Sequence, residues 1–114
     1  SVDVSSVKEL VRRWYPEGRQ PRTAAPLLIP ISQKSWGTEA LTAGGTYRLK
    51  GPLMVQLYCA TQEASIGYTF GQDKHWQIYT YPLLLPRGKT VLRVKAIRIG
   101  YQESEERTFT LVVS

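Results

Sequence analysis

Residues suited to acid–base or nucleophilic chemistry are scarce in this chain, which has one histidine, His75, and one cysteine, Cys59. Asp73 lies two residues before His75 and could orient its imidazole, yet no serine or cysteine nearby completes a nucleophilic arrangement. Cys59 follows the alternation of Val55 and Leu57, which favours a small core residue over a nucleophile. We interpret His75 as an exposed loop residue, with a pairing of Cys59 and His75 as the alternative.

Metal and phosphate chemistry have little basis in the sequence. A single Cys and a single His cannot supply four such ligands to zinc. Gly44-Gly45 lacks the lysine and the helix that follow in a phosphate-binding loop. The acidic residues after Gly100 form a turn that balances Arg107. We therefore expect no catalysis by this chain itself, no metal site and no cofactor.

The aromatic residues are the better candidates for a binding role, because sugar rings present apolar C–H faces that stack on Trp and Tyr. Tyr79 and Tyr81 share the parity of a strand, so they would form a platform of two rings if that face is exposed. The alternative is that most of these residues pack in the core or between domains. The candidates for glycan contact are Trp36, His75, Trp76, Tyr79 and Tyr81.

The net charge of +6 allows three interpretations. The basic residues alternate with apolar ones over a turn and a strand, as on the solvated face of a sheet. Attraction for sulfated or uronic glycans is a second possibility. Nucleic-acid binding by an OB-like fold is a third, but the continuous basic and aromatic strand it needs is missing. The residues concerned are Arg87, Lys89, Arg93, Lys95 and Arg98.

Residues 1–16 are predicted to hold a short amphipathic helix, followed by a linker over 17–26. Val7, Leu10, Val11 and Trp14 fall on one helical stripe. Ser6 and Glu9 fit a capping box, and Pro16 ends the helix. Such a short helix must dock on another surface. We expect it to belong to, or leave, a preceding domain, with Val7, Leu10 and Trp14 as interdomain contacts; a local cap on the next domain is the alternative.

Residues 27–114 are predicted to form an antiparallel β-sandwich of seven or eight short strands, because alternating segments are separated by Gly, Pro and polar turns. Pro30 places the first strand at a sheet edge. A bulge near Ala96 would turn Ile97 and Ile99 inward. The expected inward residues are Leu53, Val55, Leu57 and Cys59, then Ile66, Tyr68 and Phe70, then Leu92, Val94 and Ala96, and last Phe109, Leu111 and Val113.

Four segments in this order resemble the C-terminal immunoglobulin-like module of chitobiases and β-hexosaminidases, which recurs at the C-terminus of bacterial sulfatases. They are Cys59-Ala-Thr, Ala64-Ser-Ile-Gly-Tyr-Thr, Ile78-Tyr-Thr-Tyr-Pro82 and Lys95-Ala-Ile-Arg-Ile-Gly-Tyr-Gln-Glu-Ser104. The chain departs from that family at Phe70-Gly-Gln-Asp73, where a Thr-x-Asp-Gly turn is usual. The resemblance implies an immunoglobulin-like arrangement and a periplasmic or secreted parent.

The functional hypothesis is a non-catalytic accessory domain that packs on the catalytic domain of a sulfatase and shapes its substrate cleft. The Cys/Ser-x-Pro-x-Arg context of sulfatase nucleophiles is absent, since Cys59 is followed by Ala-Thr. The alternative is an autonomous carbohydrate-binding module for sulfated or acidic glycans. The expected partners are the catalytic domain and glycans, not nucleic acid. We expect no membrane contact either, because no apolar run approaches about 20 residues. The start at Ser1 suggests a piece of a longer chain.

Overall fold

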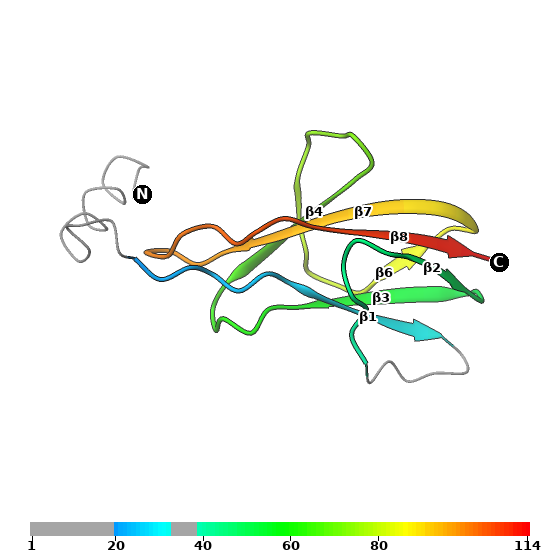
Figure 1. Ribbon diagram of the computed structural model, residues 1–114, viewed down its shortest axis with the longest axis horizontal. Coiled ribbons are helices and arrows are strands. Elements are labelled where there is room, and N and C mark those ends of the chain that lie inside the picture. Colours follow the sequence, from blue (N-terminus) through cyan, green and yellow to red (C-terminus); the bar gives the residue numbers. More distant parts are fainter. Residues whose placement is uncertain (1–19, 33–38) are drawn as a thin grey trace.

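The computed structural model describes residues 20–32 and 39–114, which form two stacked β-sheets (Figure 1). One sheet has the order β1-β3-β6 and the other the order β2-β8-β7-β4-β5. The described residues contain no helix. The strands are β1 (Leu27–Ser32), β2 (Thr46–Leu49), β3 (Leu53–Tyr58), β4 (Ser65–Phe70), β5 (Gln77–Ile78), β6 (Leu83–Leu85), β7 (Gly88–Ile97) and β8 (Arg107–Val113).

The strand order confirms the predicted immunoglobulin-like sandwich. Lettered A, A′, B, C, C′, E, F and G, the eight strands give an A-B-E sheet that faces an A′-G-F-C-C′ sheet. All pairs are antiparallel except β2 and β8, which are parallel. This pair departs from the purely antiparallel prediction, because the chain passes to the second sheet after β1 instead of turning back along it.

The core lies between the two sheets and is built from alternate residues of the long strands. Val55 and Val94 are fully buried in facing sheets, and Phe109 is 1% exposed. Burial alternates without a break along β3, as the sequence predicts for a strand with one solvated face. The buried apolar residues are Leu28, Leu53, Val55, Leu57, Ile66, Leu85, Leu92, Val94, Ala96, Phe109, Leu111 and Val113.

The predicted inward positions are less buried than expected at two strand ends. Cys59 lies just beyond β3 and is half-buried: it packs against the core as predicted, and its thiol donates a hydrogen bond to the Ala24 carbonyl (3.2 Å). Phe70 is the last residue of β4 and is 39% exposed. Tyr68, in the same strand, packs against the core as predicted.

The predicted bulge near Ala96 is wrong. β7 pairs with β4 in unbroken register as far as Ile97, which lies opposite Ser65. Beyond the last β7–β8 pair, Ser104 takes the place of β8: it receives a hydrogen bond from the Ala96 amide and donates its own amide to the Ala96 carbonyl. The strand therefore keeps its alternation, and Ile97 and Ile99 are exposed rather than buried.

The predicted linker needs a correction where the structure describes it, at residues 20–26. Thr23 is 2% exposed, and its amide donates to the Gln102 carbonyl at 2.9 Å. The Gln102 amide in turn donates to the Pro21 carbonyl. Pro26 is fully buried. These contacts hold 20–26 against the β7–β8 connection, so the sandwich includes residues that precede Leu27. The predicted helix and residues 17–19 lie outside the described ranges.

Candidate functional site

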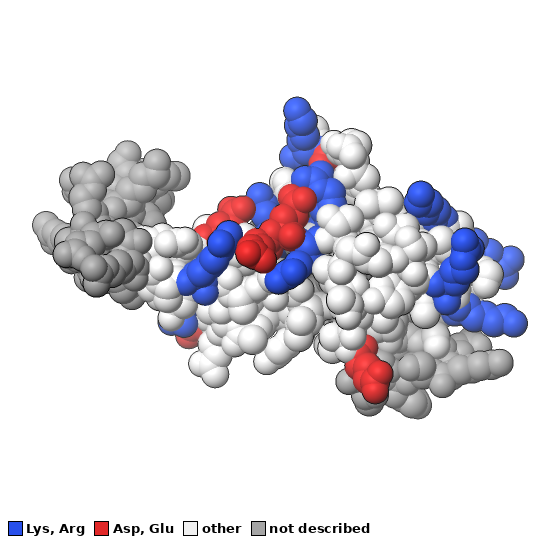
Figure 2. Space-filling view, viewed as in Figure 1, with Lys and Arg blue, Asp and Glu red and all other residues white. Residues whose placement is uncertain are grey.

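The outer face of the five-stranded sheet, turned away from the core, carries a group of interacting polar side chains. Acidic and basic side chains lie together over β7 and β8 (Figure 2). The pairing register places Thr69 opposite Arg93, Gly67 opposite Lys95 and Ser65 opposite Ile97. Directly paired residues share one face of a sheet, so these six residues all lie on the outer face.

Arg93 organises this face. Its guanidinium donates two hydrogen bonds to the Glu106 carboxylate, from Nε (3.1 Å) and Nη2 (2.9 Å). Its Nη1 donates to the carbonyls of Gly71 (3.3 Å) and Asp73 (3.1 Å). The hydrogen bond from Arg93, more than the charge attraction, holds the pKa of Glu106 below its usual value. One side chain thus joins β7, the chain before β8 and the loop between β4 and β5.

Trp76 lies against the sheet beside Arg93. The Lys95 Nζ is 4.3 Å from the centroid of the Trp76 ring, and the Arg93 Cζ is 5.2 Å from it. Both distances are in the range of cation–π attraction. Gly67 lies below the ring, and a Cβ there would be 3.6 Å from Trp76 Cε3, which is an ordinary van der Waals contact. The loop also covers Thr69, which is 1% exposed although it lies on the outer face.

Next to Trp76 the surface forms an open hollow of about 160 Å³, which we call the outer-face hollow. Its apolar walls are Trp76, Ile78 and Ile97, and both isoleucines are exposed, by 67% and 48%. At its rim Lys95 and Glu103 form an ion pair at 3.2 Å. The lining residues are Ser65, Gly67, Trp76, Gln77, Ile78, Lys95, Ala96, Ile97 and Glu103. This arrangement can accept an apolar side chain or ring.

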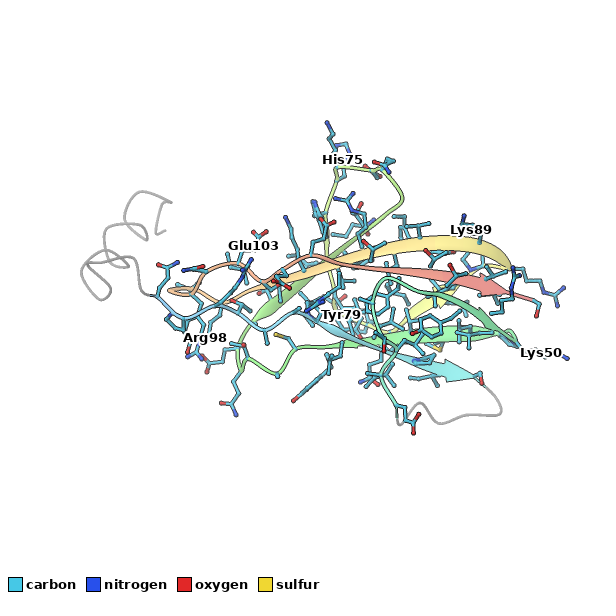
Figure 3. The ribbon with its side chains drawn as sticks, viewed as in Figure 1. Lys50, His75, Tyr79, Lys89, Arg98 and Glu103 are labelled. Carbon is cyan, nitrogen blue, oxygen red and sulfur yellow. The ribbon has the colours of Figure 1, made fainter. Side chains whose placement is uncertain are left out.

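His75 stands at the tip of the β4–β5 loop (Figure 3), with its side chain 96% exposed. Its backbone amide and its Nδ1 both contact Asp73 Oδ1, at 3.0 and 3.1 Å. The backbone hydrogen bond is the main reason that the pKa of Asp73 is lowered. His75 therefore orders its own loop, and the described residues include no group of three His, Cys, Asp or Glu placed to hold a metal.

The structure describes four of the five predicted glycan contacts, His75, Trp76, Tyr79 and Tyr81, and places them in different surroundings. Tyr79 packs against the core and donates its amide to the Ile66 carbonyl (2.7 Å), whereas Tyr81 is 76% exposed. They therefore do not form the proposed platform of two exposed rings. Of these four described candidates, only Trp76 lines the outer-face hollow. Trp36 and the predicted interdomain contacts Val7, Leu10 and Trp14 lie outside the described residues.

The sequence analysis missed the isoleucine walls of the hollow. Ile97 shares the parity of Arg93 and Lys95, which indicates the outer face once no bulge is assumed. Gly67 was a second signal, because a glycine inside a strand often marks a place where another group approaches closely.

The comparisons with known proteins support the fold. No protein-family model matches this chain, and no curated protein matches it. Its structure is similar to that of the extracellular domain of the putative hybrid two-component system BT3049 from B. thetaiotaomicron, with a TM-score of 0.53 and 12% sequence identity. The match covers 89% of this chain and 16% of that chain, so this chain spans a small part of its neighbour's length. Within the described ranges, no helix is long and apolar enough to cross a membrane.

Proposed function

We propose that this chain is a non-catalytic β-sandwich module of a longer, extracytoplasmic protein, and that its outer face packs against a neighbouring domain of the same protein. The observation that carries the proposal is the outer-face hollow, where Ile78 and Ile97 are exposed beside Trp76. An apolar centre with a charged rim, here Lys95 and Glu103, is the usual anatomy of a protein interface.

The energy available from this surface suits an interdomain contact. Fully burying an isoleucine side chain contributes roughly 1.5–3 kcal/mol, and Ile97 and Ile78 still expose about half to two-thirds of their surface. A partner that covers both would gain about 1–2 kcal/mol from Ile78 and about 0.7–1.4 kcal/mol from Ile97. This is modest for two free proteins, because association in solution also costs translational freedom. A tethered neighbour pays less of that cost, so a domain of the same chain is the best occupant.

Two observations bear on the identity of the longer protein. The four segments that resemble the sulfatase C-terminal module favour a sulfatase, whose catalytic domain would then be the neighbour. The similarity to part of a large extracellular domain favours a sensor protein instead. Both alternatives place the module outside the cytoplasm. Glycan binding through the loop aromatics is less well supported, because Tyr79 packs against the core and Trp76 contacts two cations.

The test compares hydrogen exchange in the 114-residue chain and in its full-length parent. We expect the amides of β5 and of its neighbouring loop to be more protected in the parent. Ile97→Asp should remove that extra protection, because it places a charge in the apolar centre. Leu84→Asp is the matched control, since Leu84 is 68% exposed on the other sheet. Equal protection in both proteins, or equal effects of the two substitutions, would refute the packing surface. A Cys/Ser-x-Pro-x-Arg motif upstream would identify a sulfatase.

A further inference from the structure

One end of the sandwich collects four exposed cations, Arg48, Lys50, Arg87 and Lys89, which we call the basic end. Arg48 on β2 and Lys89 on β7 are both paired with Val112, from opposite sides of β8. They therefore share the outer face and lie about 10 Å apart, which is two strand spacings. Lys50 follows β2 and Arg87 precedes β7, and Figure 3 places Lys50 and Lys89 at the same end.

Among the described residues, no Asp or Glu side chain forms an ion pair with a cation at this end. Over β7 and β8 the other cations are neutralised in ion pairs, which are Arg93–Glu106, Lys95–Glu103, Arg98–Glu63 and Arg107–Glu105. Figure 2 shows the basic side chains at that end without acidic neighbours. Such a concentration of one sign attracts an anionic partner.

An apolar hollow adjoins the basic end. It is open, measures about 530 Å³ and is lined by Phe70, Gly71, Pro86, Lys89, Thr90 and Val91. Phe70 is 39% exposed. Lys89 belongs to both features, so one ligand can place an apolar face in the hollow and its anionic groups near the cations.

We propose that the basic end binds an anionic polysaccharide that carries sulfate or uronate groups. Acidic sugars combine the two chemistries that this surface offers, because each ring has an apolar C–H face and bears charge at its edge. A lipid bilayer fits less well, since membrane-binding surfaces insert protruding apolar residues, whereas Phe70 in this hollow is only 39% exposed. This inference goes beyond the proposed packing role and uses other residues, so the two can fail separately.

The test measures binding of the 114-residue chain to heparin by titration calorimetry at low ionic strength and at about 0.15 M salt. We expect Arg87→Gln/Lys89→Gln to weaken binding about tenfold, as the loss of two exposed charge contacts implies. Arg48→Gln/Lys50→Gln should weaken it similarly. The matched control, Arg22→Gln/Lys74→Gln, removes the same net charge elsewhere and should change affinity less than about twofold. Melting temperatures check that each variant folds.

Further arms separate the alternatives. Binding to polygalacturonate as well as heparin would extend the ligands from sulfate to carboxylate sugars, and binding to heparin alone would restrict them to sulfated ones. Phe70→Ser should weaken binding without changing its salt dependence, because apolar contact is not screened. An unchanged affinity for Phe70→Ser would overturn the placement of a sugar ring. Equal losses in test and control variants, absence of heparin binding, or stronger binding to phosphatidylglycerol vesicles would overturn the proposal.

Discussion

Thr23 joins the segment before β1 to the far end of β7, and replacing it by valine tests where this domain begins. Its hydroxyl donates to the Gln102 carbonyl at 2.8 Å and accepts from the Arg98 amide at 3.1 Å. The side chain is 2% exposed, so solvent is poorly placed to replace either bond. Valine keeps the shape of threonine but can neither donate nor accept.

The expected loss of stability comes mainly from the Arg98 amide. The Gln102 carbonyl keeps a partner in Thr23→Val, because it also accepts from the Thr23 backbone amide at 2.9 Å. The Arg98 N–H loses the hydroxyl, and an unsatisfied buried donor costs about 1–3 kcal/mol. The added methyl group recovers part of this, so we expect a net loss of about 1–2 kcal/mol. That corresponds to a fall in melting temperature of roughly 5–10 °C.

Urea denaturation of wild type, Thr23→Val and Thr46→Val measures the effect. Thr46 is exposed on β2, so its substitution should change the free energy of unfolding by about 0.5 kcal/mol or less. If both variants were as stable as wild type, the contacts of 20–26 would not contribute to the folded domain. The boundary at residue 27 that the sequence indicated would then stand.

Two further predictions concern titration and thiol access. The ion pair with Arg93 lowers the pKa of Glu106 in the folded state and so stabilises the fold. This stabilisation is fully present above the ordinary pKa of 4.5, and it is lost as pH falls through the lower pKa of the folded state. Wild type should therefore lose more stability than Arg93→Gln between about pH 5 and pH 3 in urea titrations, and parallel curves would contradict the ion pair. Cys59 should react with a thiol reagent more slowly in the native than in the denatured chain, because it is half-buried and its thiol is hydrogen-bonded to the Ala24 carbonyl. Equal rates would show that the thiol is exposed to solvent.

The alternation of side chains predicted the core well where a strand has one buried face and one solvent-exposed face. Leu53, Val55 and Leu57 of β3 are the clearest case, since polar or flexible residues separate them and the structure buries all three. The order of the strands in the sheets could not be derived from this pattern. The resemblance of the second half of the chain to an immunoglobulin-like module implied the general arrangement, and the structure gives the order of the strands.

The prediction for Ile97 was wrong because the alternation was combined with the assumption that isoleucine is buried. A bulge was then needed to reconcile Ile97 and Ile99 with Leu92 and Val94. The structure keeps β7 regular and leaves both isoleucines outside. An apolar residue on a solvated face is informative about binding rather than about the core. The assumption that isoleucine is buried therefore prevented the sequence analysis from identifying Ile97 as part of the outer-face hollow.

The basic end could not be predicted because it depends on register between distant strands. Arg48 and Lys89 are 41 positions apart in the sequence and meet only because both strands pair with β8 at Val112. In sequence order, Lys89 groups instead with Arg93 and Lys95. The structure separates these cations, since the latter two are paired with Glu106 and Glu103.

The two proposed surfaces lie toward opposite ends of the same face, and this placement lets them work together. Lys89 and Ile97 are eight residues apart on β7, which at about 3.3 Å per residue separates them by about 25 Å. A domain packed over the outer-face hollow can therefore leave the basic end accessible. Ile97→Asp should disturb packing in the parent without weakening heparin binding, and Arg87→Gln/Lys89→Gln should do the reverse. Such independence is expected because a rigid strand holds each surface in place without coupling one to the other.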